Sequence, residues 1–194
     1  MRIFIALDID ENIRSRIEVF MHGVSGFAPD ARWVRIESMH VTLKFIGNKS
    51  AEEVENIKQA LARIPVGAIE ISVRGCGFFP TSKLPRVFWV GVEAGPQLAA
   101  LAKSVDEATA ALGIPKEEHA FSPHLTLARG GGSAAPRVRK GDAPNHTFLL
   151  LQKRLAAMPA PEFGTMTARE FFLYESQLGR GGSRYTKIAR FGLI

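Results

Sequence analysis

The stretches His40-Val41-Thr42-Leu43 and His124-Leu125-Thr126-Leu127 repeat one pattern, His-x-Thr-Leu, within a chain of 194 residues. Alternate side chains of an extended strand share a face, so the histidine and threonine of each stretch project together while the apolar residues point into the core. Two imidazoles with ordinary pKa values of about 6.5 can act together as acid and base near neutral pH. The pattern therefore predicts one shared site to which each half of the chain contributes a histidine and a hydroxyl.

A shift of 84 residues, the spacing between the two histidines, extends the repeat to the surrounding sequence. The same shift aligns Arg2-Ile3-Phe4 with Arg86-Val87-Phe88. Apolar positions of an intervening helix also coincide: Ile17 with Leu101, Met21 with Val105, and Val24 with Ala108. Strand, helix and His-x-Thr strand thus recur in one register. We expect a single bilobal domain over residues 1–194, with one motif in each lobe, at 40–43 and 124–127.

The composition is that of a globular protein with a basic surface. Hydrophobic residues make up 46% of the chain, and its net charge of +6 favours a polyanionic partner such as nucleic acid. Cys76 is the single cysteine, which excludes an intramolecular disulfide and a cysteine zinc cluster and fits a reducing compartment. No apolar run approaches the roughly 18 residues needed to span a bilayer. We expect a cytoplasmic protein, monomeric and without a membrane partner.

Apolar residues at steps of three and four predict three helices, each with one buried face. These series are Ile13, Ile17, Phe20 and Val24; Val54, Ile57, Leu61 and Ile64; and Leu98, Leu101, Val105, Ala108 and Leu112. Ser50 and Glu53 are spaced as a capping box. Segments with strand character are 2–8, 32–36, 40–46, 68–74, 86–92, 124–129, 147–155, 169–175 and 184–191. Early alternation followed by consecutive strands predicts an α+β fold with mainly antiparallel sheets.

Several other polar and aromatic residues receive structural interpretations. Three histidines without a motif context are interpreted as surface or loop residues: His22, His119 and His146. Two acids are interpreted as strand-end and helix-entry residues: Asp8 and Asp10. Three aromatic residues either stack on a base or pack in the core or at the rim: Trp33, Tyr174 and Tyr185. Residues 130–145 begin with three glycines and are interpreted as a mobile basic loop. A solvated connector is favoured over a phosphate-cradling loop, because no strand–loop–helix context with a P-loop lysine follows.

The paired motifs suit the cleavage of a phosphodiester. Breaking a P–O bond of a ribose cyclic phosphate requires one group that deprotonates water and another that protonates the departing oxygen. Two histidines can do both without a metal, and no third ligand accompanies them for a zinc site. Hydroxyls and a guanidinium stabilise charge on the non-bridging oxygens. Arg129 is the guanidinium nearest in sequence, but strict alternation places it opposite His124, so its participation requires a bulge or a strand that ends near Ala128.

The chain resembles the two-histidine phosphoesterase superfamily and, within it, the bacterial RNA 2′,3′-cyclic phosphodiesterases, also described as 2′–5′ RNA ligase-like proteins. The resemblance covers nearly the whole chain and rests on paired motifs and flanks in a fixed order. The matching stretches are 2–7, 33–34, 39–47, 122–129, 173–178 and 181–185. Residues 130–145 match least. This resemblance implies a bilobal, pseudo-twofold α+β fold in which two antiparallel sheets line a central groove and helices cover the outside.

The resemblance also implies a reaction, namely metal-independent hydrolysis of a terminal 2′,3′-cyclic phosphate on RNA to a 2′-phosphate. By carry-over onto matching positions, His40 would donate a proton to the leaving 3′ oxygen and His124 would activate water. Thr42 and Thr126 would bind the phosphate oxygens, with Arg129 nearby, and no cofactor is expected. The symmetry of the two motifs does not distinguish acid from base.

Three other functions remain open at the level of sequence. A ligase acting at 2′–5′ junctions would use an RNA 5′-hydroxyl in place of water, and no motif separates the two reactions. A non-catalytic RNA- or nucleotide-binding module would keep phosphate contacts but would tolerate the loss of either histidine, which the two intact motifs disfavour. A small cyclic nucleotide or cyclic ADP-ribose phosphate is a further candidate substrate.

Overall fold

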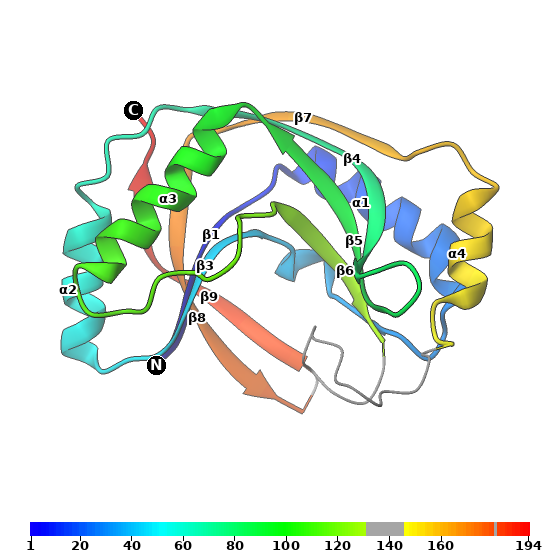
Figure 1. The fold of residues 1–194 in the computed structure, drawn as a ribbon, viewed down its shortest axis with the longest axis horizontal. Coiled ribbons are helices and arrows are strands. Elements are labelled where there is room, and N and C mark those ends of the chain that lie inside the picture. Colours follow the sequence, from blue (N-terminus) through cyan, green and yellow to red (C-terminus); the bar gives the residue numbers. More distant parts are fainter. Residues whose placement is uncertain (131–145, 181) are drawn as a thin grey trace.

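The computed structural model describes residues 1–130, 146–180 and 182–194 (Figure 1). The elements before the second motif are β1 (Arg2–Leu7), α1 (Glu11–Val24), the 3₁₀ helix η1 (Ser25–Phe27), β2 (Arg32–Trp33), the 3₁₀ helix η2 (Ile36–Ser38), β3 (Val41–Asn48), α2 (Ala51–Leu61), β4 (Ile69–Pro80), β5 (Pro85–Ala94) and α3 (Pro96–Ala110). The later elements are β6 (His124–Arg129), α4 (Leu149–Ala156), β7 (Glu162–Ala168), β8 (Glu170–Gly179) and β9 (Gly182–Gly192).

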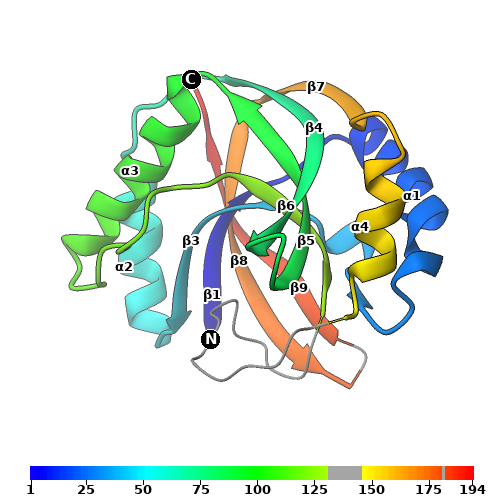
Figure 2. The same ribbon diagram turned by 45° about the vertical axis from the view of Figure 1, so that its right-hand side comes forward.

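The strands form two antiparallel sheets, which confirms the predicted fold class. One sheet has the order β3-β1-β8-β9 and the other the order β2-β6-β5-β4-β7. Each motif strand pairs with the strand that begins its half of the repeat, β3 with β1 and β6 with β5. Figures 1 and 2 show α2 and α3 on one flank of the sheets, and α1 and α4 on the other.

Buried residues from both sheets and all four α-helices pack in one hydrophobic cluster. The apolar residues of the two motifs belong to it, since Val41, Leu43, Leu125 and Leu127 are 5% exposed or less. The helices form where their apolar stripes predict, and the capping box of Ser50 and Glu53 is present at the start of α2. No helix within the described ranges is long and apolar enough to cross a membrane.

Several predictions about local structure are wrong, and one strand was not predicted. Residues 147–155 were expected as a strand, but α4 lies there, with Phe148 and Leu151 buried and Leu150 exposed. A short apolar run does not distinguish strand from helix by its periodicity, and this one lacks β-branched residues after Thr147. The predicted strand 32–36 stops at Trp33, because η2 begins at Ile36.

The other two errors concern β7 and the end of α3. Strand β7 was not predicted, because Gly164 adopts a φ of +122° and interrupts the alternation of its buried residues. Leu112 was expected on the buried face of a helix, but α3 ends at Ala110 and Leu112 is exposed. The predicted basic loop, apart from Gly130, lies outside the described residues.

A buried ion pair connects the first motif strand to the second half of the chain. Lys44 of β3 is 2% exposed, and its Nζ lies 2.5 Å from Asp106 Oδ1 of α3 and donates to the carbonyl of Pro115 at 2.9 Å. Asp106 Oδ1 also accepts the backbone N–H of Glu117. One carboxylate thus ties β3, α3 and the segment that leads to β6.

Asp106→Asn is therefore expected to destabilise the protein by about 3 kcal/mol, because it leaves the Lys44 ammonium buried without its counter-charge. Lys44→Met should cost clearly less, because the side chain of Asp106 keeps 21% exposure to water. Urea unfolding measures both, with Glu107→Gln in the exposed pair with Lys103 as a control that changes stability by about 0.5 kcal/mol or less. Equal losses in the two variants would contradict this order.

Candidate active site

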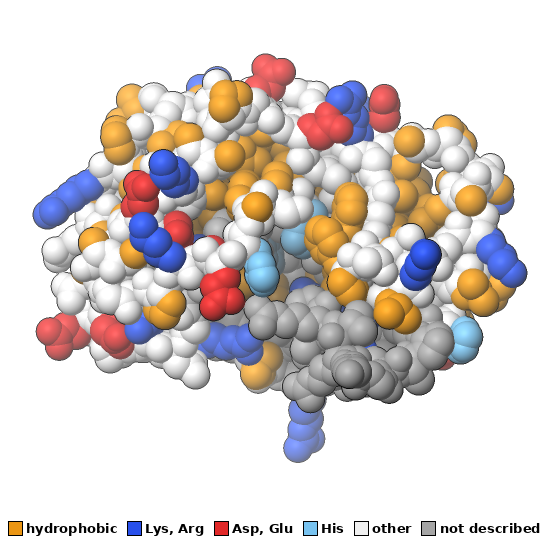
Figure 3. Space-filling view, in the orientation of Figure 1, with side chains coloured by type: hydrophobic (Ala, Val, Ile, Leu, Met, Phe, Trp, Pro, Cys, Tyr) orange, Lys and Arg blue, Asp and Glu red, His pale blue; other side chains and the backbone are white. Residues whose placement is uncertain are grey.

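The two motifs present their polar residues as predicted. Thr42, His124 and Thr126 are partly exposed and alternate with buried aliphatic neighbours along β3 and β6, and His40 immediately precedes β3. His124 lies opposite Gly91 of β5, and Thr126 lies opposite Trp89. Thr42 and His124, although they belong to different sheets, line one cavity of about 540 Å³. Figure 3 shows histidine side chains in a hollow at the centre of the molecule.

The two histidine rings are held by equivalent hydrogen bonds. Nδ1 of His40 donates to the carbonyl of Ser38 at 2.8 Å, and Nδ1 of His124 donates to the carbonyl of Ser122 at 2.8 Å. A carbonyl only accepts, so Nδ1 carries the hydrogen and Nε2 is left to gain or lose a proton. The two serines are themselves related by the shift of 84 residues, which is a signal the sequence offers for this contact.

Aromatic rings surround each histidine. The ring centroid of His40 lies 4.7 Å from Phe4, and Tyr174 and Tyr185 lie at 6.1 and 5.2 Å. Phe79 meets His124 edge-on, with centroids 4.9 Å apart. Tyr174 and Tyr185 therefore border the site, and burial raises the pKa of the Tyr174 hydroxyl.

Trp33 does not share the surroundings of the two tyrosines. Its Nε1 donates to the carbonyl of Ala28, and its ring packs edge-on against the buried Phe88. Of the two interpretations left open for Trp33, the packing role is the one the structure supports.

Arg129 faces the site because β6 contains the bulge that its participation requires. Phe88 pairs with Ala128 and the next residue, Trp89, pairs with Thr126, so Leu127 has no partner across the ladder. Leu127 and Ala128 are both buried, which returns Arg129 to the partly exposed face of His124. The same bulge occurs in β3, where Leu43 is skipped between Lys44 and Thr42.

The surroundings shift the pKa of both histidines. Partial burial lowers the pKa of His40 and of His124, because it disfavours the charged imidazolium, whereas the Ser38 and Ser122 carbonyls act in the opposite direction. The guanidinium of Arg129 also lowers both values. The charge of His124 also lowers the pKa of His40, which disfavours a state in which both rings are protonated.

A second cavity, of about 420 Å³, adjoins His40. It is lined by polar and charged residues that include Asp8, Arg14, Tyr174, Arg184 and Lys187. Asp8 directly follows β1, which ends at Leu7, and it lines the same cavity as His40, which its position in the sequence did not indicate. Asp10 occupies the N-cap position of α1, as the helix-entry interpretation requires.

In the part of the chain that the structure describes, the other three histidines do not form a metal site with the two motif histidines. His22 and His146 are exposed, whereas His119 lies in the segment before β6 and lines the 540 Å³ cavity. Among the residues that the structure describes, no group of three or more His, Cys, Asp or Glu side chains is placed to hold a metal ion.

Comparisons with known proteins identify the family of the chain. The model of the family described as LigT like Phosphoesterase matches residues 7–89 and again residues 90–185, so each match contains one motif. The RNA 2′,3′-cyclic phosphodiesterase of Archaeoglobus fulgidus is 31% identical, with 98% of this chain and 99% of the relative covered. The Escherichia coli enzyme of the same name is 29% identical over 99% of this chain and 96% of its own.

Solved structures share the fold. The crystal structure of Escherichia coli LigT complexed with 3′-AMP superposes with a TM-score of 0.77 and 28% identity. The alignment covers 99% of this chain and 97% of that one.

Proposed function

The chain belongs to the LigT-like phosphoesterase family, and from this premise we propose that it hydrolyses the 2′,3′-cyclic phosphate at the end of an RNA to a 2′-phosphate. The observation that carries the proposal is the matched pair of histidines, each with its Nδ1 hydrogen held by a carbonyl two residues earlier. Such a pair has two Nε2 atoms free for proton transfer. Its relatives named RNA 2′,3′-cyclic phosphodiesterase span archaea and bacteria.

In the proposed reaction one proton leaves the attacking water on one side of the phosphorus, and another is given to the departing oxygen on the opposite side. His124 takes a proton from water through Nε2 as the water oxygen bonds to phosphorus. His40 donates a proton through Nε2 to the 3′ oxygen as the bond between that oxygen and phosphorus breaks. The product is a 2′-phosphate with a free 3′-hydroxyl. Exchange of protons with solvent then restores the neutral His124 and the protonated His40.

The phosphate is held by neutral and charged donors. The hydroxyls of Thr42 and Thr126 lie on the same strand faces as the histidines and donate to the non-bridging oxygens, whose charge grows in the transition state. The guanidinium of Arg129 adds a positive charge to this wall of the site. Binding of the substrate anion offsets the electrostatic cost of grouping Arg129 with two histidines.

Arg129→Met is expected to lower kcat by about 10- to 100-fold, because the developing charge loses its cationic partner. Arg129→Lys should recover part of the rate, because the lysine ammonium restores the positive charge. Recovery should be incomplete, because an ammonium cannot form the paired hydrogen bonds that a planar guanidinium can form with a phosphate. Steady-state kinetics with cytidine 2′,3′-cyclic phosphate measures both, with Arg63→Met, at an exposed position after α2, as the control. Wild-type kcat in the methionine variant would remove Arg129 from the site.

Hydrolysis and ligation are separated by offering the enzyme both nucleophiles. An RNA that ends in a 2′,3′-cyclic phosphate is incubated with a second, labelled RNA that carries a 5′-hydroxyl. We expect the cyclic phosphate to be opened mainly by water, because water is present in large excess over any RNA end. Joined RNA as the main product would overturn the hydrolytic assignment. Tight binding without any conversion would identify a binding module.

A further inference from the structure

The two histidines are equivalent in the repeat but unequal in their charged surroundings. Three residues on the His40 side form a polar network: Asp8, Arg14 and Ile36 through its carbonyl. The shift of 84 residues relates the two charged members, Asp8 and Arg14, to Val92 and Leu98, which are apolar. At the equivalent positions, the second half of the chain therefore lacks the carboxylate and arginine of this network; the charged or titratable residues that line the cavity of His124 are Lys44, Lys103, Asp106, Glu117 and His119.

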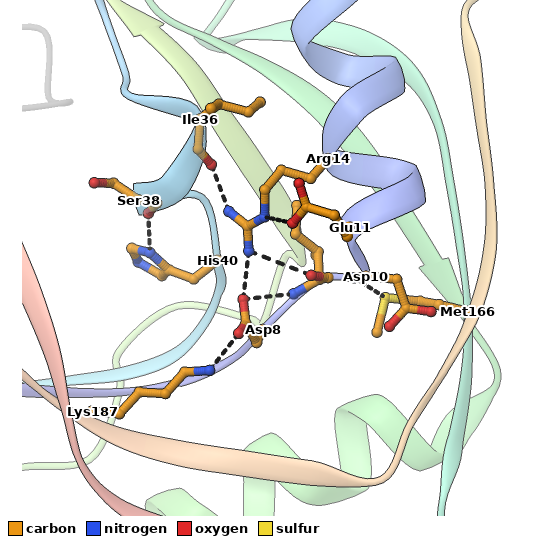
Figure 4. A network of polar contacts seen from close by, with 10 residues as sticks. Asp8, Asp10, Glu11, Arg14, Ile36, Ser38, His40, Met166 and Lys187 are labelled. Carbon is orange, nitrogen blue, oxygen red and sulfur yellow. Dashed lines mark hydrogen bonds and ion pairs between the residues drawn. The ribbon is translucent and has the colours of Figure 1, made fainter.

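The network begins with a carboxylate that two cations hold. Asp8 Oδ1 accepts a hydrogen bond from Arg14 at 2.6 Å, and Asp8 Oδ2 lies 2.5 Å from Lys187 Nζ of β9 (Figure 4). The backbone N–H of Ile9 donates to the same carboxylate. Arg14 is 9% exposed, so its guanidinium is a buried anchor with little freedom to move.

Arg14 also links the carboxylate to the turn that holds His40. Its second terminal nitrogen donates to the carbonyl of Ile36 at 2.5 Å. Ile36 begins the short helix η2, and Ser38 at the end of η2 supplies the carbonyl that accepts from His40 Nδ1. Figure 4 shows the Arg14 guanidinium between the Ile36 carbonyl and Asp8, with His40 next to this network on the segment that follows η2. The contacts of Arg14 with Asp8 and with the Ile36 carbonyl thus fix the Asp8 carboxylate relative to the turn that holds His40.

Many charged or titratable groups surround His40. Those lining its cavity or acting on the ring are Asp8, Arg14, Glu37, His124, Arg129, Tyr174, Arg184, Tyr185 and Lys187. Asp8 raises the pKa of His40, against burial, His124 and Arg129, which lower it. His124 experiences the cation Arg129, and no carboxylate raises its pKa among the described residues. Asp8 is thus the carboxylate that favours a proton on His40, and no described carboxylate does the same for His124.

We propose that Asp8, held in place by Arg14 and Lys187, keeps the proton on His40 and so makes this ring the acid of the pair. Asp8 is a positioning residue that acts through His40. The proposal rests on the two-histidine mechanism proposed above and adds to it the feature that breaks the symmetry of the motifs.

The test is the pH dependence of kcat/KM for cytidine 2′,3′-cyclic phosphate in Asp8→Asn. Above the pKa of both rings, the rate follows the fraction of His40 that is still protonated, so a lower proton affinity lowers the rate there. Below both pKa values, the rate follows the fraction of His124 that is deprotonated, so it stays unchanged. We expect a loss of about three- to tenfold on the alkaline side and none on the acid side.

Lys187→Met provides a second variant with the opposite sign. Removing this half-exposed cation leaves the charge of Asp8 less compensated, so the alkaline-side rate should rise about twofold. Glu93→Gln, which removes a carboxylate from an exposed pair with Arg74, is the control with an unchanged profile. Asp8→Asn also removes the charged partner of a buried arginine and therefore risks unfolding the protein. If Asp8→Asn does not fold, Lys187→Met still tests the proposal.

The outcomes separate this proposal from the proposed function. Wild-type protein that hydrolyses the cyclic phosphate, together with Asp8→Asn and Lys187→Met profiles that coincide with wild type, would overturn the role of Asp8 alone. A uniform loss at every pH in Asp8→Asn would also overturn it, because a change confined to geometry moves both limbs equally. Wild-type protein that leaves the cyclic phosphate intact would instead refute the proposed function. NMR titration of His40 should show a lower pKa in Asp8→Asn.

Discussion

Replacing either His40 or His124 by alanine is expected to lower kcat by about 10²- to 10⁴-fold, because each variant loses one of the two proton transfers. The double variant should be little worse than the slower single variant, since the two rings act in the same step. Turnover of cytidine 2′,3′-cyclic phosphate at saturation measures these losses. His22→Ala, which removes an exposed histidine at the end of α1, should keep wild-type turnover.

Substrate binding gives the matching control for the histidine variants. In this account the phosphate is held by the threonine hydroxyls and Arg129, so the affinity for the 2′-phosphate product should change far less than kcat. Fluorescence anisotropy with a labelled short RNA bearing that phosphate measures the affinity. A variant that keeps most of its turnover would remove that histidine from the mechanism.

The threonine hydroxyls are expected to give the second largest effect. Thr42→Val and Thr126→Val preserve shape and remove one neutral donor each, so each should lower kcat by up to about 10²- to 10³-fold. Serine at the same positions should restore most of the rate, because it returns the hydroxyl. Thr165→Val, which removes a hydroxyl from the exposed contact with Ser72, is the matched control. If neither valine variant slows turnover, the phosphate-binding role is wrong.

The sequence predicts most of the fold because its signals are local and repeated. Alternation along 40–43 and 124–127 requires only that strands bury one face, and Val41, Leu43, Leu125 and Leu127 do so. The capping box at Ser50 forms for the same reason, since both partners lie within one turn of helix. The strand prediction for residues 147–155 was wrong because a run of leucines fits a buried strand and an amphipathic helix equally well.

The less predictable parts of the site depend on contacts between distant segments. Arg129 reaches the motif face through a bulge whose extra residue, Leu127, looks like any other strand leucine. Asp8 becomes part of the site because the Arg14 guanidinium and Lys187, 179 residues away in sequence, converge on its carboxylate. No regular spacing in the sequence predicts either the bulge at Leu127 or the contacts of Asp8, so the positions of Arg129 and Asp8 are known only from the folded structure.

The repeat and its exceptions together explain how two equal motifs serve unequal roles. The strands, the bulges and the Ser38 and Ser122 carbonyls are duplicated, so each ring has the same orientation and the same free nitrogen. The charged residues are not duplicated, since Asp8 and Arg129 stand where the other half has Val92 and Phe45. Duplication therefore provides the geometry of the pair, and in the proposed mechanism single positions determine where its proton is held.

The most direct measurement incubates the protein, with EDTA present, with a short RNA that ends in a 2′,3′-cyclic phosphate and identifies the terminal phosphate of the product. A 2′-phosphate formed at an undiminished rate, and lost in His40→Ala and His124→Ala, is the predicted result. A 3′-phosphate would contradict the assignment of the leaving oxygen to His40. Activity abolished by EDTA would contradict the metal-independent mechanism, and an unchanged RNA would contradict the proposed hydrolysis itself.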